Sequence, residues 1–436
     1  MKAVKFGGTS MSTAESIKTV KRIVESDPER RFIVVSAPGV TTTEAKVTDV
    51  LISVAERKGA DRVNSFATVK NRFIGICNGL GLEGFLDGDF RMIETVLPNA
   101  DDGYIISRGE YLCAKLAARF LGYPFVDAAG IIKFHGGVYD DDTTETVCAP
   151  VLNGYKCAVI PGFYGSDEQG KTVIFPRGGS DISGAIVARA VNASVYENFT
   201  DVDGFMTSDP RVVPHAEPLD LLTYMELREL AYMGANVLHP ESIFPARRAN
   251  IPIHILNTFN AAAHGTMIVP TELFLSGKYK RKRRSVVTAV AGKRHFSSLY
   301  IDKSMTYAEV GFIRRVLGCF ESLNIHVEHI SSGIDSVTVV FSARERETAD
   351  RLMCAVKKEV SPDRINLTTD VSLIAIVGHG MCRRRDVVAR AVNRLSNADI
   401  NLLLIDRSAS EINIILAVSD NDFERALIAL NGEFEI

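Results

Sequence analysis

The segment Lys2-Ala-Val-Lys5-Phe-Gly7-Gly8-Thr-Ser10 decides the architecture of the first half of the chain, because an apolar strand runs directly into two glycines. A helix follows, and Ser12 and Glu15 have the spacing of a capping box at its start. The glycine backbone and the helix N-terminus then present N–H groups to one point, which attracts anions, and Lys5 adds a positive charge beside it. This pattern predicts a phosphate site. The alternative is a tight turn that uses its glycines for backbone reasons only.

Beyond this segment, the first 270 or so residues alternate short β-branched runs with longer amphipathic stretches. Further strands are expected at Arg31 to Ser36, Cys157 to Pro161, Val195 to Phe199 and Ile253 to Ile255. The stretches between them repeat apolar residues at helical spacing, as after Ser12. Strands that alternate with helices predict an α/β domain with a mostly parallel sheet.

Composition sets the class of protein. The chain has 436 residues, 46% of them hydrophobic, with 50 Lys and Arg against 53 Asp and Glu, so we expect several globular domains. A net charge of −3 argues against a general attraction to nucleic acid. No apolar run of about 18 residues appears, and the first residues lack the apolar core of a signal peptide. We therefore expect a cytoplasmic protein without membrane segments, and seven cysteines that are buried and reduced.

The last third of the chain contains an internal repeat. Ser298-Leu-Tyr-Ile aligns with Ser372-Leu-Ile-Ala, and Asp335-Ser-Val-Thr-Val aligns with Ser410-Glu-Ile-Asn-Ile. A basic run at Lys278 to Arg284 precedes the repeat and is interpreted as a solvated linker or a chain reversal. We therefore divide the chain into domains 1–284, 285–367 and 368–436. Two small units with exposed sheet edges can pair with each other or across a dimer, which favours regulatory modules.

One motif is misleading. Gly165-Ser-Asp-Glu-Gln-Gly170-Lys171-Thr172 satisfies the spacing of a P-loop. A working P-loop opens a helix, whereas Lys171 is followed by Thr172-Val-Ile-Phe-Pro, which favours a strand. Two acidic residues inside the loop would also repel a triphosphate. We expect a hairpin tip here, and the alternative is a P-loop nucleotidase that uses Lys171.

Three further segments carry side chains suited to chemistry. Arg177-Gly-Gly-Ser180-Asp181 opens a helix that Ser180 or Asp181 can cap, and Arg177 is placed to grip a carboxylate or only to cap carbonyls nearby. Asn198 to Arg211 is a strand followed by a loop rich in hydroxyls and carboxylates. Ser107-Arg-Gly-Glu110 precedes a helix expected from Tyr111, where Glu110 either binds a ligand or caps the helix dipole.

The combination of these motifs resembles aspartate kinases over essentially the whole chain. The motifs are Lys5-Phe-Gly-Gly-Thr-Ser10, Arg177-Gly-Gly-Ser-Asp181, Thr200-Asp-Val-Asp-Gly204, Ser208-Asp-Pro-Arg211 and Val237-Leu-His-Pro240. The resemblance implies a three-layer α/β amino acid kinase domain with a mostly parallel sheet, followed by two α+β ferredoxin-like ACT domains. It also implies transfer of the γ-phosphoryl group of ATP to the side-chain carboxylate of L-aspartate, the first step of lysine, threonine and methionine biosynthesis. A carboxylate acceptor is already ionised at neutral pH, so no general base is required.

By this resemblance Lys5 contacts the transferred phosphoryl group, and Asp181 holds Lys5 in place. Gly7 and Gly8 donate backbone N–H groups to the phosphates. Electrostatic stabilisation of this kind takes the place of an acid–base pair.

The resemblance also assigns the aspartate pocket. Arg177 corresponds to the residue that grips the α-carboxylate, Glu110 to the one that pairs with the ammonium group, and Ser36 and Thr41 to hydroxyls that line the pocket.

The nucleotide residues implied by the resemblance, besides Lys5 and the two glycines, are Thr200, Asp201, Met206, Asp209, Arg211 and Asn236. Met206 and Asn236 replace the Tyr and Lys that are usual in the family, which raises the alternative of a non-catalytic amino-acid sensor. Mg²⁺ is expected to arrive with ATP, with no metal site in the protein.

ACT domains bind amino acids at strand-to-helix turns. The effector residues implied here are Met305, Gly311, Phe312, Ile313, Val327, Glu328, Asp335 and Ser336. Glu328 and Asp335 can balance a cationic side chain, so we expect feedback by lysine, and the alternative is that both acids are only solvated. We also expect a homodimer or homotetramer formed through the ACT domains.

Overall fold

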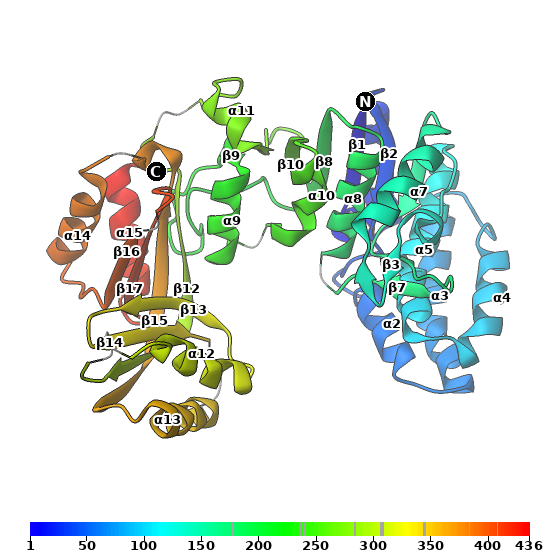
Figure 1. Cartoon of the computed structure of the whole chain (residues 1–436). Coiled ribbons are helices and arrows are strands. Elements are labelled where there is room, and N and C mark those ends of the chain that lie inside the picture. The colour runs from blue at the N-terminus through cyan, green and yellow to red at the C-terminus, as the bar shows by residue number, and fades with distance from the viewer. Residues whose placement is uncertain are drawn as a thin grey trace. The chain divides into compact units, whose positions relative to one another are not determined.

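The computed structural model describes residues 1–176, 178–235, 237–238, 240–282, 285–305, 309–342, 346–382, 384–407 and 409–436. The chain forms two compact units (Figure 1). The first unit comprises Met1–Phe205, Pro218–Leu227 and Asn236–Lys282, and the second comprises Met206–Glu217, Arg228–Ala235 and Arg283–Ile436. Within the described residues, no helix is both long enough and apolar enough to cross a lipid bilayer.

The first unit is built on a sheet of seven described strands in the order β5-β2-β1-β8-β10-β11-β9. The strands are β1 (Lys2–Phe6), β2 (Arg30–Val35), β5 (Ala158–Pro161), β8 (Val195–Thr200), β9 (Leu221–Thr223), β10 (Ile253–Asn257) and β11 (Thr266–Val269). Every neighbouring pair is parallel except β10 and β11. This confirms the mostly parallel sheet, and each strand expected from the sequence is present.

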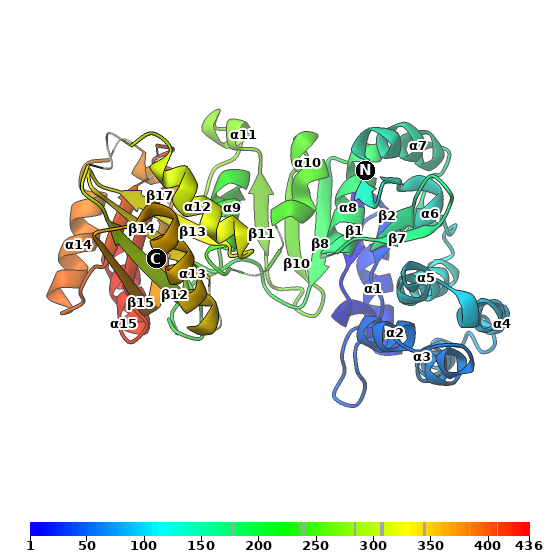
Figure 2. The ribbon, with the colours of Figure 1, turned by 60° about the horizontal axis from the view of Figure 1, so that its bottom comes forward.

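Helices cover both faces of this sheet (Figure 2). From β1 the chain continues to β2 and then to β5, so these strands are added toward the β5 edge of the sheet. After β5 the chain crosses to the other side of β1, where β8 and then β10 are added toward the opposite edge. Because such crossovers are right-handed, α1 and α5 lie on one face, and α8 and α10 lie on the other. The helices are α1 (Ala14–Glu25), α2 (Val47–Ala55), α3 (Ala60–Gly79), α4 (Asp87–Val96), α5 (Asp102–Leu121), α6 (Ala128–Ile131), α7 (Asp141–Asn153), α8 (Gly179–Ala190), α10 (Phe244–Arg248) and α11 (Thr271–Leu275). Two short hairpins, β3 (Phe134–His135) with β4 (Val138–Tyr139) and β6 (Tyr164–Ser166) with β7 (Thr172–Ile174), complete the unit.

The second unit contains the repeat as a six-stranded sheet in the order β13-β14-β12-β15-β17-β16 among the described strands. Its elements are β12 (Ala289–Asp302), α12 (Phe312–Ser322), β13 (Val327–Ser332), β14 (Ser336–Phe341), α13 (Arg346–Val360), β15 (Arg364–Val377), α14 (Val387–Asn397), β16 (Leu404–Arg407), β17 (Asn413–Ser419) and α15 (Phe423–Phe434). The helix α9 (Tyr224–Tyr232) contributes its last residues to this unit.

Two hydrophobic cores share the long strands β12 and β15. Leu299 from the end of β12 and Leu367 from the start of β15 pack in the first core. Val290 from the start of β12 and Ile376 from the end of β15 pack in the second core. Each long strand therefore contributes one half to the core of the first repeat and the other half to the core of the second repeat. The linear domain boundaries stay a prediction, and Val290 shows that the second core also draws on the segment before residue 368.

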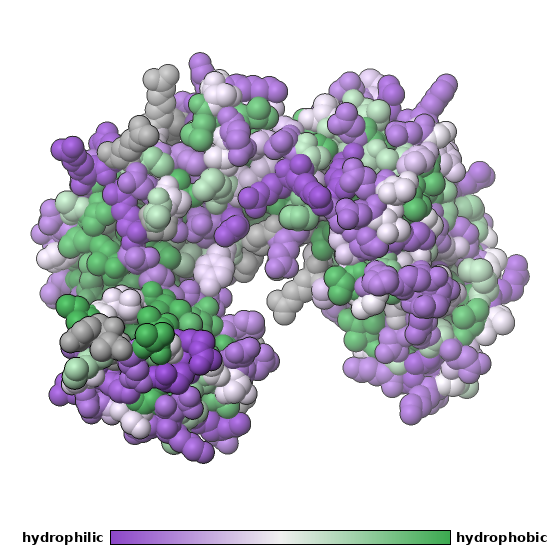
Figure 3. All heavy atoms as spheres, in the orientation of Figure 1, coloured by the Kyte–Doolittle hydropathy of each residue, from purple (hydrophilic) through white to green (hydrophobic). Residues whose placement is uncertain are grey.

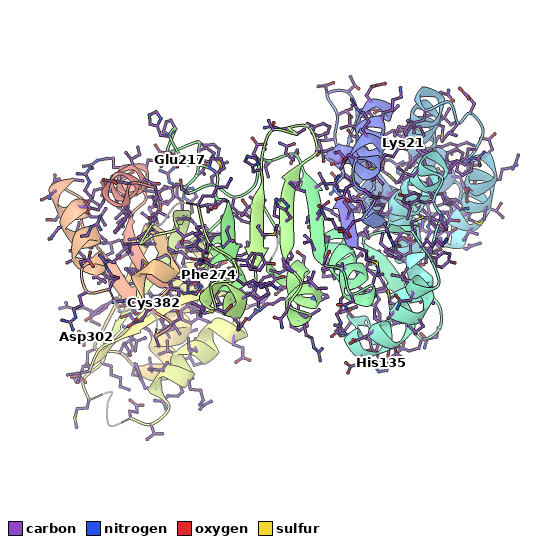
Figure 4. The ribbon with its side chains drawn as sticks, turned by 90° about the horizontal axis from the view of Figure 1, so that it is seen from above. Lys21, His135, Glu217, Phe274, Asp302 and Cys382 are labelled. Carbon is purple, nitrogen blue, oxygen red and sulfur yellow. The ribbon has the colours of Figure 1, made fainter. Side chains whose placement is uncertain are left out.

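Two expectations need correction. In the basic run, Arg281 is not solvated: it donates to the carbonyl of Leu221 at 3.0 Å, pairs with the buried Glu226 and stacks 4.8 Å from the ring of Phe274, labelled in Figure 4. Residues Arg283 and Arg284 lie outside the described part of the chain. The seven cysteines all lie within the described residues and form no disulfide, but Cys354 is exposed and Cys157 and Cys382 are only partly buried.

Candidate active site

Lys5, at the end of the central strand β1, forms the centre of the candidate site. Its ammonium group lies 2.6 Å from Oδ1 of Asp181, which comes from the first turn of α8. It also donates to Oδ1 of Asn198 at 3.3 Å, and the Asn198 amide donates to Asp181 Oδ1 at 2.9 Å. Lys5 and Asn198 are buried. Three side chains from three elements therefore form a closed polar triangle inside the first unit.

Asn198 stands at the start of the segment Asn198 to Arg211, but the sequence assigns it no role in the site. Strands β1 and β8 are parallel neighbours, and Lys5 stands opposite Asn198 in their register. The sequence does contain one indication: Asn198 is an amide in a strand that is otherwise expected to be buried, and a buried polar group requires a hydrogen-bond partner. Its partner becomes visible only when the strands are aligned.

The glycine turn after β1 differs from the expectation in two ways. Gly7 donates its N–H to the carbonyl of Phe199 at 3.1 Å and so continues the sheet ladder, which leaves Gly8 as the glycine for a phosphate. The predicted capping box is wrong: the short 3₁₀ turn η1 (Thr9–Met11) intervenes, and Thr13 and Ser16 form the box at the start of α1. The Ser12 hydroxyl donates instead to the carbonyl of Thr9.

The second glycine corner also begins its helix earlier than expected. Gly178 is the N-cap of α8 in a left-handed conformation, with φ of 57°, and makes no side-chain cap. Capping by Ser180 or Asp181 is therefore wrong, because both lie within the helix. This placement leaves the Asp181 carboxylate available to Lys5. Arg177 lies outside the described residues.

Glu110 does not precede a helix but lies in the middle of α5. The helix continues through Gly109 because that residue packs against α2, where an added Cβ would come within 3.2 Å of Ala37, Val47 and Leu51. Glu110 is 3% exposed, and its Oε2 has no hydrogen-bond partner. Burial raises the pKa of its carboxyl to about 7. A buried carboxyl with one unsatisfied oxygen is suited to receive a cationic group.

Ser36 and Thr41 lie in the loop that joins β2 to α2. The backbone N–H of Ser36 donates to the carbonyl of Phe6 at 3.1 Å, which places Ser36 beside the end of β1. The Thr41 hydroxyl accepts the N–H of Glu44 at 3.0 Å, so it stabilises the turn of its own loop.

The predicted nucleotide residues are distributed between the units. In the first unit, Asp201 accepts hydrogen bonds from the hydroxyls of Thr9 and Thr200 at 3.1 and 3.2 Å, which ties the end of β8 to the glycine turn. In the second unit, Arg211 pairs with Asp209 at 2.7 Å. Met206 also belongs to the second unit, whereas Asn236 lies outside the described residues.

The P-loop lookalike is a hairpin, as expected. Gly165 to Thr172 connects β6 to β7, and Asp167 at its tip accepts the N–H groups of Gln169 and Lys171 at 3.0 and 2.8 Å. Glu168 pairs with His135, which Figure 4 labels at the edge of the unit. The Lys171 side chain is 59% exposed and lies 3.9 Å from Asp101. No described helix begins here, so the interpretation as a P-loop is wrong.

The first repeat of the second unit has a cavity of about 330 Å³ at its strand-to-helix turn. Gly311, Phe312 and Ile313 line it, as do Glu309, Arg314, Ser332, Gly333, Ile334 and Val337. Met305, Val327, Glu328, Asp335 and Ser336 are not among the lining residues. Figure 3 shows hydrophobic surface in the region of β14 and α12, where Ile313 and Ile334 are exposed.

At the corresponding turn of the second repeat, the described residues pack closely together. Met381 is fully buried in the second core, and Val286 packs against that core. A Cβ on Gly378 or Gly380 would come within 2.9 Å of the carbonyl oxygen of Val286. The two repeats therefore share a fold, but the turn that is open in the first is filled in the second.

Comparison with known proteins connects both units to described families. A model of the amino acid kinase family matches residues 1–257, and a model of an ACT domain matches residues 374–434. The chain is 34% identical to Aspartokinase 3 of Bacillus subtilis, with all of this chain and 98% of that protein aligned. It is 28% identical to the chloroplastic Aspartokinase 3 of Arabidopsis thaliana, over 99% of this chain and 81% of that protein.

Solved structures give the same result. The crystal structure of the Clostridium acetobutylicum aspartate kinase superposes with a TM-score of 0.93 at 35% identity, over 100% of both chains. Aspartokinase III of E. coli, in complex with lysine and aspartate, has a TM-score of 0.79 at 24% identity, over 100% of this chain and 99% of that one, which is a likeness of fold.

Proposed function

This chain belongs to the amino acid kinase family, and within it to the aspartate kinases. On that basis we propose a role in substrate binding or catalysis for each residue of the site. The enzyme transfers the γ-phosphoryl group of ATP to the side-chain carboxylate of aspartate and is built with ACT regulatory domains. The observation that carries our proposal is the ion pair between the buried Lys5 and the partly buried Asp181 at the end of β1, beside the glycine turn. Two anions must meet in this reaction, and a fixed cation there offsets their repulsion.

Lys5 would contact the transferred phosphoryl group, with Asp181 as its counter-ion. The Asn198 amide connects both groups, so the lysine is held in one position before substrate arrives. Preorganisation of this kind lowers the barrier because the charge need not be reoriented during reaction. The N–H of Gly8 would point to the phosphate chain, while Gly7 leaves room beside the ammonium group, 3.6 Å from where its Cβ would stand.

The aspartate substrate would be held by its two charged ends. Glu110 would receive the ammonium group, which supplies the partner that its Oε2 lacks. Binding a cation next to a buried carboxyl favours its ionised form, so substrate binding and ionisation of Glu110 support each other. Arg177 is proposed for the α-carboxylate, with Ser36 and Thr41 lining the pocket. No proton has to be removed from the acceptor oxygen, because that carboxylate is ionised at neutral pH.

ATP would be bound near the end of β8 through Thr200 and Asp201. Asp201 reaches Thr9 in the turn after β1, so both segments stand on the same edge of the sheet. The roles of Met206, Asp209, Arg211 and Asn236 stay predictions from sequence. We propose that Mg²⁺ enters as part of the substrate MgATP and supplies charge neutralisation on the phosphates.

The direct test is an assay with MgATP, aspartate and hydroxylamine, which traps an acyl phosphate as a hydroxamate. We expect a hydroxamate that depends on both substrates. Its absence across pH and effector conditions, together with calorimetric binding of an amino acid but not of ATP, would support the alternative of a non-catalytic sensor.

For the second unit we propose that the cavity of the first repeat binds an amino acid effector, and that this effector is lysine. Asp335 directly follows the segment Ser332 to Ile334, which lines the cavity, and Glu328 lies earlier on β13, so a cationic side chain would find negative charge nearby. Turnover measured with lysine, threonine or methionine added singly tests this. Lysine alone should inhibit, and Asp335→Asn should weaken that inhibition. Inhibition by threonine and not by lysine would contradict it. A dimer or tetramer through these domains is proposed as well, to be checked by light scattering.

A further inference from the structure

The loop of residues 36–46, which carries Ser36 and Thr41, lies directly on the glycine turn. Gly39 donates its N–H to the carbonyl of Gly8 at 2.8 Å. A Cβ on Gly39 would stand 2.6 Å from the carbonyl carbon of Gly8, so only glycine allows the two backbones to approach this closely. The loop precedes α2 and is the blue loop beside that helix in Figure 2. Any displacement of this loop therefore changes the distance between Ser36 or Thr41 and the glycine turn.

One side chain connects the two segments from outside the site. Arg72, on α3, donates through Nη1 to the carbonyl of Ala45 and through Nη2 to the carbonyls of Gly39 and Ser12. The bond to Ser12 measures 3.3 Å. Gly39 and Ala45 lie in the loop, whereas Ser12 follows the glycine turn.

Arg72 is only 7% exposed, which is unusual for a charged residue without a buried counter-ion. Its ionic partner is Glu44, whose Oε2 lies 3.3 Å from Nε and whose side chain is 46% exposed. The buried positive charge of Arg72 is therefore stabilised mainly by hydrogen bonds to three backbone carbonyls. A planar guanidinium, with five donors in a fixed fork, can serve several carbonyls at once, whereas a lysine ammonium acts as a single point.

We propose that Arg72 is a positioning residue, which holds the 36–46 loop against the glycine turn and so sets the place of the aspartate substrate relative to the phosphoryl group. We expect Arg72 to contact neither substrate. The inference rests on the proposed function, because it takes Ser36 and Thr41 as part of the aspartate pocket. It goes beyond that function by assigning the geometry of the pocket to a side chain on a helix that carries no substrate contact.

The test compares Arg72→Lys with Arg72→Ala in the hydroxamate assay. Arg72→Lys keeps the charge but cannot span all three carbonyls, so we expect the KM for aspartate to rise about tenfold, while the KM for ATP changes less than about threefold. Arg72→Ala should be more strongly impaired, and millimolar guanidinium chloride should restore part of its activity by filling the vacated site. Lys70→Met is the matched control: it removes a cation from the same helix, where Lys70 pairs with Glu94 at 2.7 Å, and should leave both KM values unchanged.

Thermal unfolding of each variant separates loss of positioning from loss of folding. If Arg72→Ala does not fold, Arg72→Lys decides the question alone. A wild-type KM for aspartate in Arg72→Lys overturns the proposal, and so does an equal rise of both KM values. If the wild-type enzyme itself forms no hydroxamate, the proposed function fails instead, so the two failures are distinguishable.

Discussion

Among the turns of the first unit that combine glycines with a lysine, two can be compared directly, and one of these two has the surroundings expected of a phosphate site. The turn at Gly7 and Gly8 ends a central parallel strand, and neighbouring elements supply Lys5 with Asp181 and Asn198. The turn from Gly165 to Thr172 joins two short strands of a separate hairpin, and its Lys171 projects into solvent. The second matches the P-loop spacing better. A lysine is therefore suited to bind a phosphate when the sheet places polar partners around it, and its spacing from glycines in the sequence matters less.

Replacing the lysine of each turn should give the largest difference in activity between the two turns. Lys5→Ala should lower turnover at least about 10²-fold, by analogy with other groups that stabilise transition-state charge. Lys171→Ala should stay within about twofold of the wild type. Turnover in the hydroxamate assay measures both, and Lys5→Met, which keeps most of the side-chain volume, controls for packing. An equal loss in the two alanine variants would contradict the comparison.

The next effect concerns the carboxylates beside the two turns. Glu110→Gln should raise the KM for aspartate roughly 10- to 100-fold, because a charge-assisted hydrogen bond to the substrate is lost. Glu168→Gln, at the hairpin tip, should leave this KM unchanged. In the wild type, the KM should fall as pH rises through about 7, since only the ionised Glu110 attracts an ammonium group.

The same residue should give a pH-dependent stability. The folded-state pKa of Glu110 is raised by burial from 4.5 to about 7, so the folded state binds the proton more tightly than the unfolded chain. Its contribution is therefore fully present below about pH 4.5 and is lost as pH rises through 7, by up to about 3 kcal/mol. Denaturant unfolding of the wild type and of Glu110→Gln at pH 5 and pH 7.5 checks this. Parallel pH profiles for the two proteins would count against it.

Glycine substitutions at the two turns should give a smaller difference in activity than the lysine and glutamate substitutions. Gly39→Ala forces a Cβ against the backbone of Gly8 and Thr9, so we expect about a tenfold loss of kcat/KM and a destabilisation of about 1–3 kcal/mol. Gly170→Ala introduces a side chain at φ of 77° with open space around it, which should cost about 1–2 kcal/mol and no activity. Thermal unfolding and turnover distinguish the two. Equal activity in both variants would show that the loop contact is unimportant.

The smallest expected effect is at the hairpin tip. Asp167→Ala removes the acceptor for two backbone N–H groups, which should cost about 1 kcal/mol of stability. Catalysis should not change, because the hairpin is not part of the site. A changed KM for ATP in this variant would reopen the question of a nucleotide at the lookalike motif.

Much of the molecule could be predicted from its sequence, because strand patterns and repeats are local. The parallel sheet, the hairpin and the internal repeat all follow from apolar periodicity and turn residues. The errors arose where packing overrides local preference. The segment Ser107 to Glu110 is expected to precede a helix that starts at Tyr111, yet α5 runs through it, and Gly109 lies there because the close approach of α5 to α2 leaves no room for a side chain. The open turn of the first repeat and the turn filled by Met381 and Val286 in the second could not be distinguished either, since both have the same strand-to-helix pattern.

Local patterns in the amino-acid sequence predict the order of the elements and a duplicated regulatory module, and the resemblance of the motifs to those of aspartate kinases implies that Lys5 and Asp181 act as a pair. Three features become visible only in the folded chain: Asn198 completes that pair, Glu110 is buried with an unsatisfied oxygen, and Arg72 connects two segments through their carbonyls. The physical reason is that these features are contacts between residues far apart along the chain. Their energies depend on burial and on strand register, and neither exists until the sheet and its helices have assembled.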